Sequence, residues 1–446
     1  MAQVSRVPAR RALPLALSLG LSGLSLPFAC AAASDPALAN EVAALRAELA
    51  RLQTRLEELE ARSAESSSRP AQTLADAATA RATADAETVA EVEAGPGLDI
   101  ADDTVGRSFG IGGRLHYDIY AHNEGARAAT GGGEFRRARV NFDGEAAGWS
   151  YRLQVELSGD AVDLRDVYLE RALGGSTLTL GQFKPHRSME ELGSSNDLSV
   201  MERGYTSAAG LFADRQWQQG VGVLTPLRAG SLGLSVFSLR EDDTARNEGW
   251  GAAARATWAP LREDTRVLHF GLWGSQERGG RNTPSVDIGA AFAGRRGPSA
   301  LIFESAQGSD FDVRSAGLEI AGRLGAFHWQ SEWARASLAG PLASGDVEAA
   351  YLQAGWVFGG SGREYELDEG LFGDMQDIGS GRWEAVARVD RILLRDSDSI
   401  EARRLVLGVN RYFSDELRLM LNWVRGEDRR IDDRAGQLGL RLQYVF

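Results

Sequence analysis

The sequence predicts an all-β fold: a 16-stranded antiparallel transmembrane β-barrel, preceded by a short periplasmic coiled-coil helix and a flexible linker. Three observations lead to it: an export signal at the N-terminus, repeated segments of about 10 alternating residues, and a final strand that ends on an aromatic residue. The 446 residues include 52 glycines and 10 tryptophans, and no spanning-length apolar run follows the leader. A helical membrane protein is therefore excluded.

A signal peptide is predicted at residues 1–31. Arg6, Arg10 and Arg11 precede an apolar stretch that runs to Phe28. The small residues that follow provide a cleavage site near Ala31, so we expect the chain to be exported. Lipid attachment at Cys30 is the alternative, which the residues before the cysteine disfavour.

A short coiled coil is predicted within residues 32–62. Its apolar residues are spaced alternately four and three apart, which is typical of helices that pair with copies of themselves. They are Leu38, Val42, Leu45, Leu49, Leu52, Leu56 and Leu59. A mostly leucine seam leaves the number of helices open, and a single amphipathic helix on the barrel or cell wall is the alternative. Residues 63–105 are rich in Ala, Ser, Thr, Asp and Glu, which predicts a flexible linker.

The barrel is predicted over residues 106–446. Leu115 and Tyr117 would face lipid while His116 faces water, because side chains alternate along a strand. In the same way residues 438, 440, 442, 444 and 446 of the last strand would face lipid. Such segments number about 16, with 299–305 assigned to a loop, and a barrel of that size should enclose an aqueous channel. We expect short connections at 145–148, 174–175 and 413–416, and long ones at 122–134, 184–213, 276–311, 336–347 and 426–436.

The second strand carries the densest group of basic residues. Alternation points Arg137, Arg139 and Asn141 inward and leaves Arg136 near the rim. Arg114 and Arg152 lie on the neighbouring strands, so several guanidinium groups could face one path for solutes. A guanidinium stays charged and can bind phosphate or carboxylate through two hydrogen bonds. The alternative is that these arginines pair with Asp118, Asp143, Glu156 or Asp166 and stiffen the wall.

From about Arg107 to Phe446 the sequence closely resembles the phosphate-selective porin O and P family. The matching motifs occur in the family's order. They are FRRARV at 135–140, LRDVYL at 164–169, LGQFK at 180–184, the Ser194-Ser195 pair, Met201-Glu202-Arg203, REYELDEGLFG at 363–373, WEAVAR at 383–388 and LGVNRYF at 407–413. The resemblance implies a trimeric, 16-stranded anion channel in which an arginine ladder leads to a constriction, formed by a loop that folds into the barrel.

The resemblance also implies which residues line the pore. Arg152 accompanies the ladder as an expected wall residue, and Arg363 and Tyr365 would lie on a periplasmic turn, 359–381, that folds inward. The residues placed near the constriction are Arg114, Arg137, Arg139, Asp166, Ser194, Ser195 and Arg203. One departure concerns selectivity: phosphate-specific members use lysines at the mouth and constriction, whereas Lys184 is the single lysine among 49 basic residues here.

The predicted function is a passive outer-membrane channel for small anions, including phosphate or polyphosphate. A general diffusion porin with little ion selectivity, combined with a cell-wall-tethering coiled coil, is the first alternative. An outer-membrane hydrolase is the second, but none of the five histidines lies in a nucleophile–base motif, and no phosphate-binding loop or zinc motif is present. We therefore expect no enzyme activity, catalytic residue, cofactor or metal.

The expected location is the outer membrane of a Gram-negative bacterium, with the N-terminal segment in the periplasm. The expected partners are small anions, outer-membrane lipid and lipopolysaccharide, two further copies in a homotrimer, and peptidoglycan through the coiled coil. The barrel assembly machinery would bind the C-terminal Phe446. The net charge of −13 argues against nucleic acid.

Overall fold

The computed structural model describes residues 91–446 with short gaps, at 95–96, 103–105, 124, 126–128, 240–248, 280–285, 306–310, 341–342, 361, 376–377, 380, 396 and 398–399. All of these residues belong to a compact unit that spans Thr88–Phe446. The predicted signal peptide at 1–31, the coiled coil at 32–62 and residues 63–90 of the predicted linker lie outside the described residues. No helix of the described part is long and apolar enough to cross a membrane.

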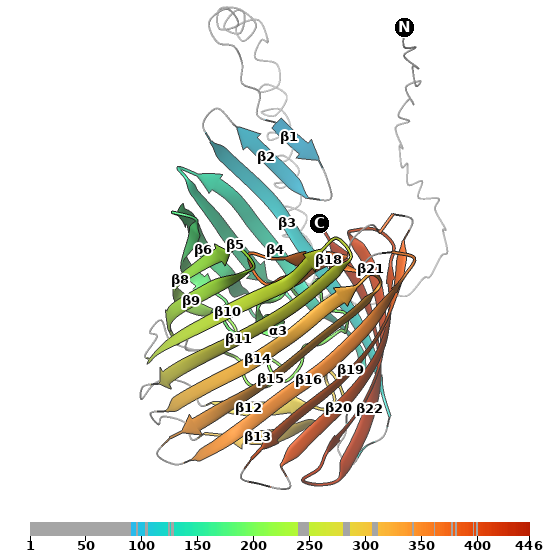
Figure 1. The fold of residues 1–446 in the computed structure, drawn as a ribbon. Coiled ribbons are helices and arrows are strands. Elements are labelled where there is room, and N and C mark those ends of the chain that lie inside the picture. Colours follow the sequence, from blue (N-terminus) through green and yellow to red (C-terminus); the bar gives the residue numbers. More distant parts are fainter. Residues whose placement is uncertain are drawn as a thin grey trace, which may run out of the picture. The chain divides into compact units, whose positions relative to one another are not determined.

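Sixteen antiparallel strands form a closed barrel, as predicted (Figure 1). Each strand pairs with the next, and the last pairs with the first through Gln437↔His122 to Val445↔Arg114. The strands are β3 (Arg107–His122), β4 (Gly132–Ala146), β5 (Trp149–Glu156), β6 (Asp163–Leu173), β7 (Ser176–Phe183), β8 (Gln218–Leu227), β9 (Gly230–Ser238), β10 (Gly249–Glu263), β11 (Arg266–Gly279), β14 (Asp312–Leu324), β15 (Phe327–Ala339), β16 (Ser344–Phe358), β19 (Arg382–Leu394), β20 (Glu401–Tyr412), β21 (Leu417–Asp428) and β22 (Asp433–Val445).

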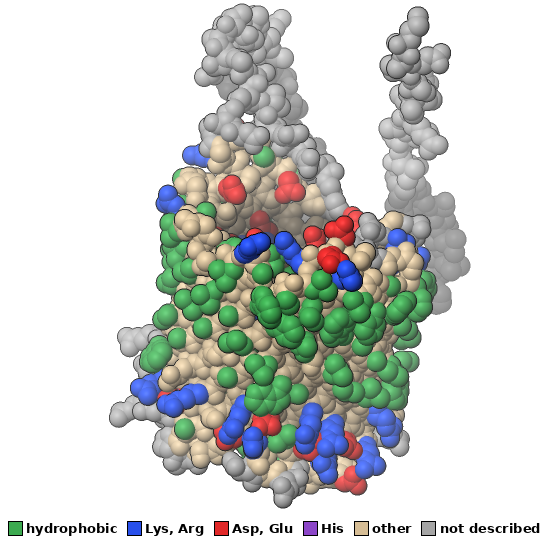
Figure 2. Space-filling model, viewed as in Figure 1, with side chains coloured by type: hydrophobic (Ala, Val, Ile, Leu, Met, Phe, Trp, Pro, Cys, Tyr) green, Lys and Arg blue, Asp and Glu red, His purple; other side chains and the backbone are tan. Residues whose placement is uncertain are grey.

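The two faces of the barrel wall differ as the alternation predicts. On β3, Leu115 and Ile119 are 40% and 47% exposed on the outside, whereas His116 and Asp118 are fully buried inside. The same contrast continues around the wall, and Figure 2 shows the outer hydrophobic side chains as a wide band. Such a band is the surface that a bilayer covers.

A hairpin precedes the barrel, which corrects the prediction of a flexible linker up to residue 105. It consists of β1 (Glu91–Ala94) and β2 (Leu98–Asp102). β2 pairs with residues 107–111 of β3. β22 does not reach this part of β3, because it pairs only with residues 114–122. The hairpin therefore occupies an edge whose backbone groups would otherwise have no partner strand.

From β3 to β15 the connections alternate between long loops and short turns. The predicted short turns are confirmed, and residues 299–305 lie in a loop hairpin of β12 (Asp287–Ala291) and β13 (Ser299–Glu304), outside the barrel sheet. Two predicted long loops are short: β15 and β16 are separated only by residues 340–343, and β21 and β22 only by 429–432. Cross-strand ion pairs, such as Arg335–Asp346 at 2.5 Å, accompany the longer strands.

Part of the barrel interior is packed rather than filled with water, contrary to the expectation of a fully aqueous lumen. The β12–β13 hairpin and the 184–217 loop place apolar side chains against the inner wall. This cluster includes Tyr205, Phe212, Trp273, Ile288, Phe292 and Phe303. The open space is therefore confined to the remainder of the cross-section.

Candidate pore and constriction

The connection between β7 and β8, residues 184–217, folds into the barrel, as the resemblance implies. Its single helical turn, α3 (Met189–Leu192), lies against β14 and β15. Ser188, which caps α3, donates to Glu332 Oε2 at 2.8 Å, and the Glu190 amide donates to Glu332 Oε1 at 2.6 Å. The Met189 amide donates to Glu319 at 2.9 Å. Carboxylates of the wall thus hold the N-terminal end of α3.

Further contacts fix the rest of this loop around the inner wall. Arg388 of β19 donates to Glu190 Oε1 at 2.7 Å, and Asn410 of β20 donates to the Ser199 carbonyl at 2.7 Å. Arg441 of β22 donates to the Met201 carbonyl at 2.6 Å. The loop is therefore bound to strands on the side of the barrel opposite β6 and β7, and it narrows the channel from that side.

A second insertion enters from the opposite end of the barrel. It is the hairpin of β17 (Arg363–Glu366) and β18 (Leu371–Met375), within the connection between β16 and β19. Arg255 of β10 donates to the carbonyls of Glu369 and Gly370 at 2.6 and 2.8 Å. Segment 359–381 thus contains an inward-folded hairpin, in agreement with the family resemblance.

The space left between these insertions and the wall is a cavity of about 1420 Å³, part of which is open to solvent. Its wall side comes from β3 to β8 and from Arg255 of β10, and its other side comes from the 184–217 loop and the β17–β18 hairpin. Six of the ten predicted pore residues line it: Arg114, Arg139, Arg152, Asp166, Ser194 and Ser195.

Arg114 faces the Ser-Ser pair of the loop across this cavity. Its Nη1 lies 3.3 Å from Ser194 Oγ and 3.1 Å from Ser195 Oγ. Within the described residues no carboxylate lies at ion-pair distance from Arg114, and its Nε has no hydrogen-bond acceptor. A guanidinium with free donors, flanked by two hydroxyl groups, is suited to bind an anion.

The other two predicted arginines of the cavity, Arg139 and Arg152, are paired with wall carboxylates, which is the predicted alternative. Arg139 donates to Glu156 Oε2 at 2.7 Å and to Gln154 Oε1 at 3.1 Å. Arg152 pairs with Asp143. Their positive charge is therefore largely balanced within the wall.

Arg136 lies inside the barrel, which corrects its predicted position near the rim. The register between β3 and β4 shifts between His116 and Tyr117, so Arg136 is the extra residue of a β-bulge. It donates two hydrogen bonds to Glu202 of the loop, at 2.8 and 2.9 Å. Its neighbour Arg137 also points inward, is 5% exposed, and contacts His116 at 3.3 Å.

The remaining predicted residues have structural partners. Asp166 accepts a hydrogen bond from Trp217 Nε1 at 2.9 Å on the cavity wall. Arg203 donates to the carbonyls of Glu190 and Gly193 at 2.8 and 2.6 Å and so holds the loop in shape. Tyr365 contacts His269 Nδ1 at 2.7 Å. Neither Arg203 nor Tyr365 lines the cavity that contains Arg114.

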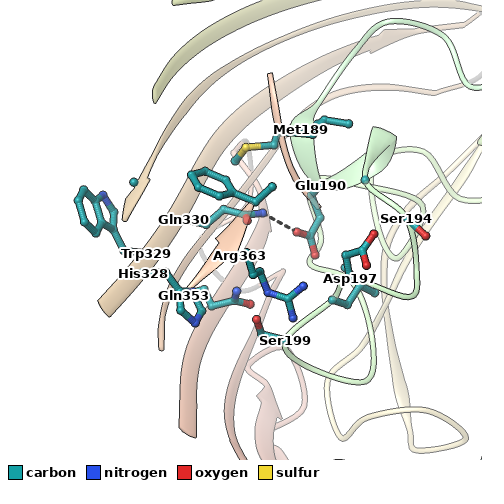
Figure 3. Close-up of a pocket in the computed structure, with 15 residues that line it drawn as sticks. Met189, Glu190, Ser194, Asp197, Ser199, His328, Trp329, Gln330, Gln353 and Arg363 are labelled. Atoms are coloured by element: carbon teal, nitrogen blue, oxygen red, sulfur yellow. Dashed lines mark hydrogen bonds between the residues drawn. The ribbon is translucent and has the colours of Figure 1, made fainter. Parts of the chain in front are cut away.

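Arg363 lies in a second, narrower space between the loop and the β15–β16 wall. Figure 3 shows it beside Ser199 and Gln353, with Asp197 and Glu190 coming from the loop. Its Nη2 lies 2.9 Å from Tyr412 OH and 3.7 Å from Glu384 Oε2. Of the predicted residues, Ser194 lines both spaces.

Several cavity residues were not among the predicted site residues. Lys184 lines the cavity and donates to the carbonyls of Leu192 and Gly193 at 2.9 and 3.1 Å. Trp217 lies between cations, with the Arg165 guanidinium 4.6 Å from its ring centroid. Lys184 could have been found because it is the last residue of the LGQFK motif at 180–184. Trp217 had no such signal, because nothing in the sequence shows where an inward loop returns.

Acidic residues balance the basic ones in number around the cavity. The bases are Arg114, Arg139, Arg152, Lys184 and Arg255, and the acids are Asp166, Glu170, Asp197, Glu366 and Glu369. Two of the loop groups that line the cavity have pKa values shifted to near neutral pH. Burial lowers the pKa of Lys184 to about 7, and burial together with the nearby Asp374 raises the pKa of Asp197 to about 6. On the inward hairpin, burial and neighbouring acids raise the pKa of Glu366 to about 7.

A closed antiparallel barrel with a hydrophobic outer band and an inward loop that leaves a charged passage defines an outer-membrane porin. The model of the phosphate-selective porin O and P family matches residues 109–446, and the chain belongs to that family. It is therefore an outer-membrane channel for anions in a Gram-negative bacterium, which places it among channels rather than enzymes.

Individual relatives agree with this assignment. The chain is 27% identical to Porin O of Pseudomonas aeruginosa over 409 residues, which cover 78% of this chain and 91% of that protein. Its fold is similar to the anion-selective porin of Comamonas acidovorans, with a TM-score of 0.54, 12% identity, and coverage of 76% of this chain and 100% of that one. The trimer form of OmpT from Vibrio cholerae gives a TM-score of 0.50 at 11% identity, covering 76% of this chain and 99% of that one.

Proposed function

We propose that the channel passes phosphate and similar small oxyanions through the cavity lined by Arg114, Ser194 and Ser195. The observation that carries this proposal is the Arg114 guanidinium, which has two hydroxyl neighbours and no carboxylate partner within the described residues. A tetrahedral oxyanion can accept hydrogen bonds from the guanidinium and from both hydroxyl groups at once. The family assignment supports the same substrate class.

Passage requires that binding be favourable but weak. An anion that enters the cavity exchanges part of its hydration for contacts with Arg114 and the serines. Arg139 and Arg152 contribute less attraction, because Glu156 and Asp143 already balance their charges. Such graded sites let the anion leave by diffusion, with no energy source.

The test is the zero-current potential of the purified protein in planar bilayers under a KCl gradient, followed by phosphate titration of the chloride current. We expect anion selectivity with saturable block by phosphate. Arg114→Gln should weaken the block about tenfold, because a charge-assisted hydrogen bond contributes about 1.5–3 kcal/mol. Ser194→Ala/Ser195→Ala should weaken it less. Arg266→Gln is the control, since Arg266 lies exposed at the start of β11 and pairs with Glu263. Unchanged block in Arg114→Gln would refute the proposed site.

A general diffusion porin is the second candidate, and the equal number of acids and bases around the cavity favours it. Five carboxylates near the path would weaken the preference for anions at low salt. In the same experiment, weak anion preference without phosphate block would support this function instead.

The remaining proposals concern the assembled protein. We propose a homotrimer, which the solved trimer of a protein with a similar fold supports. A cleaved signal peptide at 1–31, a coiled coil at 32–62 that contacts peptidoglycan, a linker that now ends before β1, and recognition of Phe446 by the assembly machinery stay predictions. A truncation that tests the tether should remove residues 32–87 only, because β1 and β2 pair with the barrel.

A further inference from the structure

The outer surface of β19 to β22 carries exposed arginines at the end where the long loops emerge. Figure 2 shows Lys and Arg side chains gathered along that rim, at the bottom of the view, next to the hydrophobic band. On this sector they include Arg391, Arg403, Arg425 and Arg434. These residues occupy strand positions that face away from the lumen, so they have no part in the pore.

The strand register arranges these side chains in two adjacent rows. In the outer row Arg391 of β19 lies directly opposite Arg403 of β20, and Arg403 lies opposite Glu427 of β21. In the next row towards the middle of the barrel, Val389 lies opposite Leu405, and Leu405 lies opposite Arg425. A charged row therefore borders an apolar row, at the level where a lipid headgroup meets its acyl chains.

Positive charge is in excess within the outer row. Arg391, Arg403 and Arg429 all pair with one carboxylate, Glu401. Like charges that lie directly opposite across strands destabilise a sheet. Arg425 adds a further cation that has no ion-pair partner among the described residues. Arg434 pairs with Glu427 and Asp432, so the arginines of this rim still outnumber the carboxylates that pair with them. Such a surplus suits an anionic group supplied from outside.

Below the arginines the surface is hollowed. The groove has a volume of about 1190 Å³, including the part open to the surroundings, and it is lined by both rows. Leu352 and Val389 in it are 54% and 49% exposed. Such a groove offers an apolar surface for acyl chains directly beside donors for phosphate.

We propose that this groove binds lipid A, the bisphosphorylated and multiply acylated saccharolipid of the outer leaflet. The arginines bind its phosphates, and the row of Leu352, Val389 and Leu405 receives an acyl chain. Charge complementarity supports this occupant, because lipid A brings the negative charge that the surplus of arginines lacks within the chain. The proposal is independent of which solute passes through the pore.

The test measures binding of hexa-acylated lipid A to the purified full-length protein in detergent micelles, by native mass spectrometry or microscale thermophoresis. We expect the bisphosphorylated lipid to bind at least tenfold more tightly than the same lipid without phosphates. Phosphatidylglycerol, which carries one phosphate and two chains, should also bind more weakly. Equal binding of the dephosphorylated lipid or of phosphatidylglycerol would overturn the proposal, and this comparison needs no variant.

A variant pair locates the site. Arg403→Gln/Arg425→Gln should weaken lipid A binding about tenfold, while Glu401 keeps Arg391 and Arg429 as partners. The matched control is Arg278→Gln/Arg314→Gln, two exposed rim arginines of β11 and β14 that share Asp312. Heat-dependent mobility on gels and an unchanged conductance report that each variant is folded. Equal effects of the two pairs, or loss of the oligomer only in the first pair, would assign the groove to general charge or to a second copy and overturn the proposal.

Discussion

Arg114 and Arg139 lie opposite each other on β3 and β4, yet their charges are balanced differently. Arg139 is held by Glu156 and Gln154, and both ion-pair partners are almost buried, with side chains 9% and 6% exposed. Arg114 meets only hydroxyl groups among the described residues. Arg139 is thus largely structural, and Arg114 remains available to a solute.

Replacing Arg139 should therefore affect stability more than selectivity. Arg139→Gln leaves Glu156 buried without its ion-pair partner, and breaking such a pair destabilises a protein by about 3–5 kcal/mol. Arg139→Gln/Glu156→Gln should recover most of the loss. The measurement is urea unfolding in lipid vesicles, arranged as a double-mutant cycle. Additive effects of the two substitutions would show that the pair is not coupled.

The pKa values of the loop and hairpin groups predict a pH-dependent selectivity. Lys184 and Glu366 titrate at about 7 and Asp197 at about 6. Each group gains a proton as the pH falls from 8 to 5, so the cavity becomes more positive and anion selectivity should rise. The zero-current potential measured across this range should show the change. Burial also raises the pKa of Glu369 beside the cavity. In Lys184→Gln/Glu366→Gln/Glu369→Gln the midpoint should therefore move to about 6, the pKa of Asp197; a midpoint still at 7 would contradict the assignment.

At the residue scale, the sequence predicts which side chains face the lumen but not which charges remain free. His116, Arg137 and Arg139 point inward because the strand period is two. Arg136 was misplaced because a one-residue bulge has no mark in FRRARV. Its partner Glu202 and the partner of Arg441, Asp118, lie 66 and 323 residues away in the sequence. Long-range pairing of this kind depends on the closed barrel.

Among the elements, the 184–217 loop controls the width of the channel because the wall holds it in several places. Glu332 of β15 has the central role: it accepts from Ser188 and the Glu190 amide at the start of α3, and from Tyr351 OH at 3.1 Å. Loss of this carboxylate would leave α3 without its main anchor.

Glu332→Leu should therefore increase the single-channel conductance and its noise, and reduce selectivity. The substituted side chain still fits an interior position, but it cannot accept the three hydrogen bonds. Single-channel recordings at constant salt provide the measurement. Glu263→Leu, at the exposed end of β10, serves as the control and should conduct like the wild type. If Glu332→Leu also leaves the conductance unchanged, the loop must be held mainly by Arg388 and Arg441.

The elements themselves were largely predictable, and the exceptions have a common cause. The alternation of apolar and polar residues predicts the sixteen barrel strands, and the positions of most short turns and long loops follow from it. Residues 98–102 are predicted as linker because the whole segment 63–105 is rich in Ala, Ser, Thr, Asp and Glu, but pairing with the free edge of β3 makes them a strand. The loops at 340–343 and 429–432 were overestimated because polar residues such as Asp346 pair across strands above the membrane.

At the scale of the whole molecule, the barrel depends on one seam. β22 reaches β3 only from Val445 to Gln437, and the chain end continues it: Gly113 and Phe446 exchange backbone hydrogen bonds of 2.6 and 3.0 Å. The inward loop also crosses this seam, since Arg441 holds both Asp118 of β3 and the Met201 carbonyl. Closing the barrel and positioning the constriction are therefore coupled.

Gly113 tests this coupling because the seam leaves no room for a side chain there. A Cβ at this position would lie 2.4 Å from the Arg139 carbonyl oxygen and 2.5 Å from the Phe446 ring. Gly113→Ala should destabilise the barrel by about 1–3 kcal/mol, the usual cost of overpacking, and should also disturb selectivity because Arg114 is adjacent. Gly274→Ala is the matched control, since its Cβ would meet only the Ser315 carbonyl, at 3.8 Å. In Gly113→Ala both the stability in urea and the zero-current potential should change, whereas in Gly274→Ala neither should. A change in the stability of Gly113→Ala alone would show that the seam and the pore are independent.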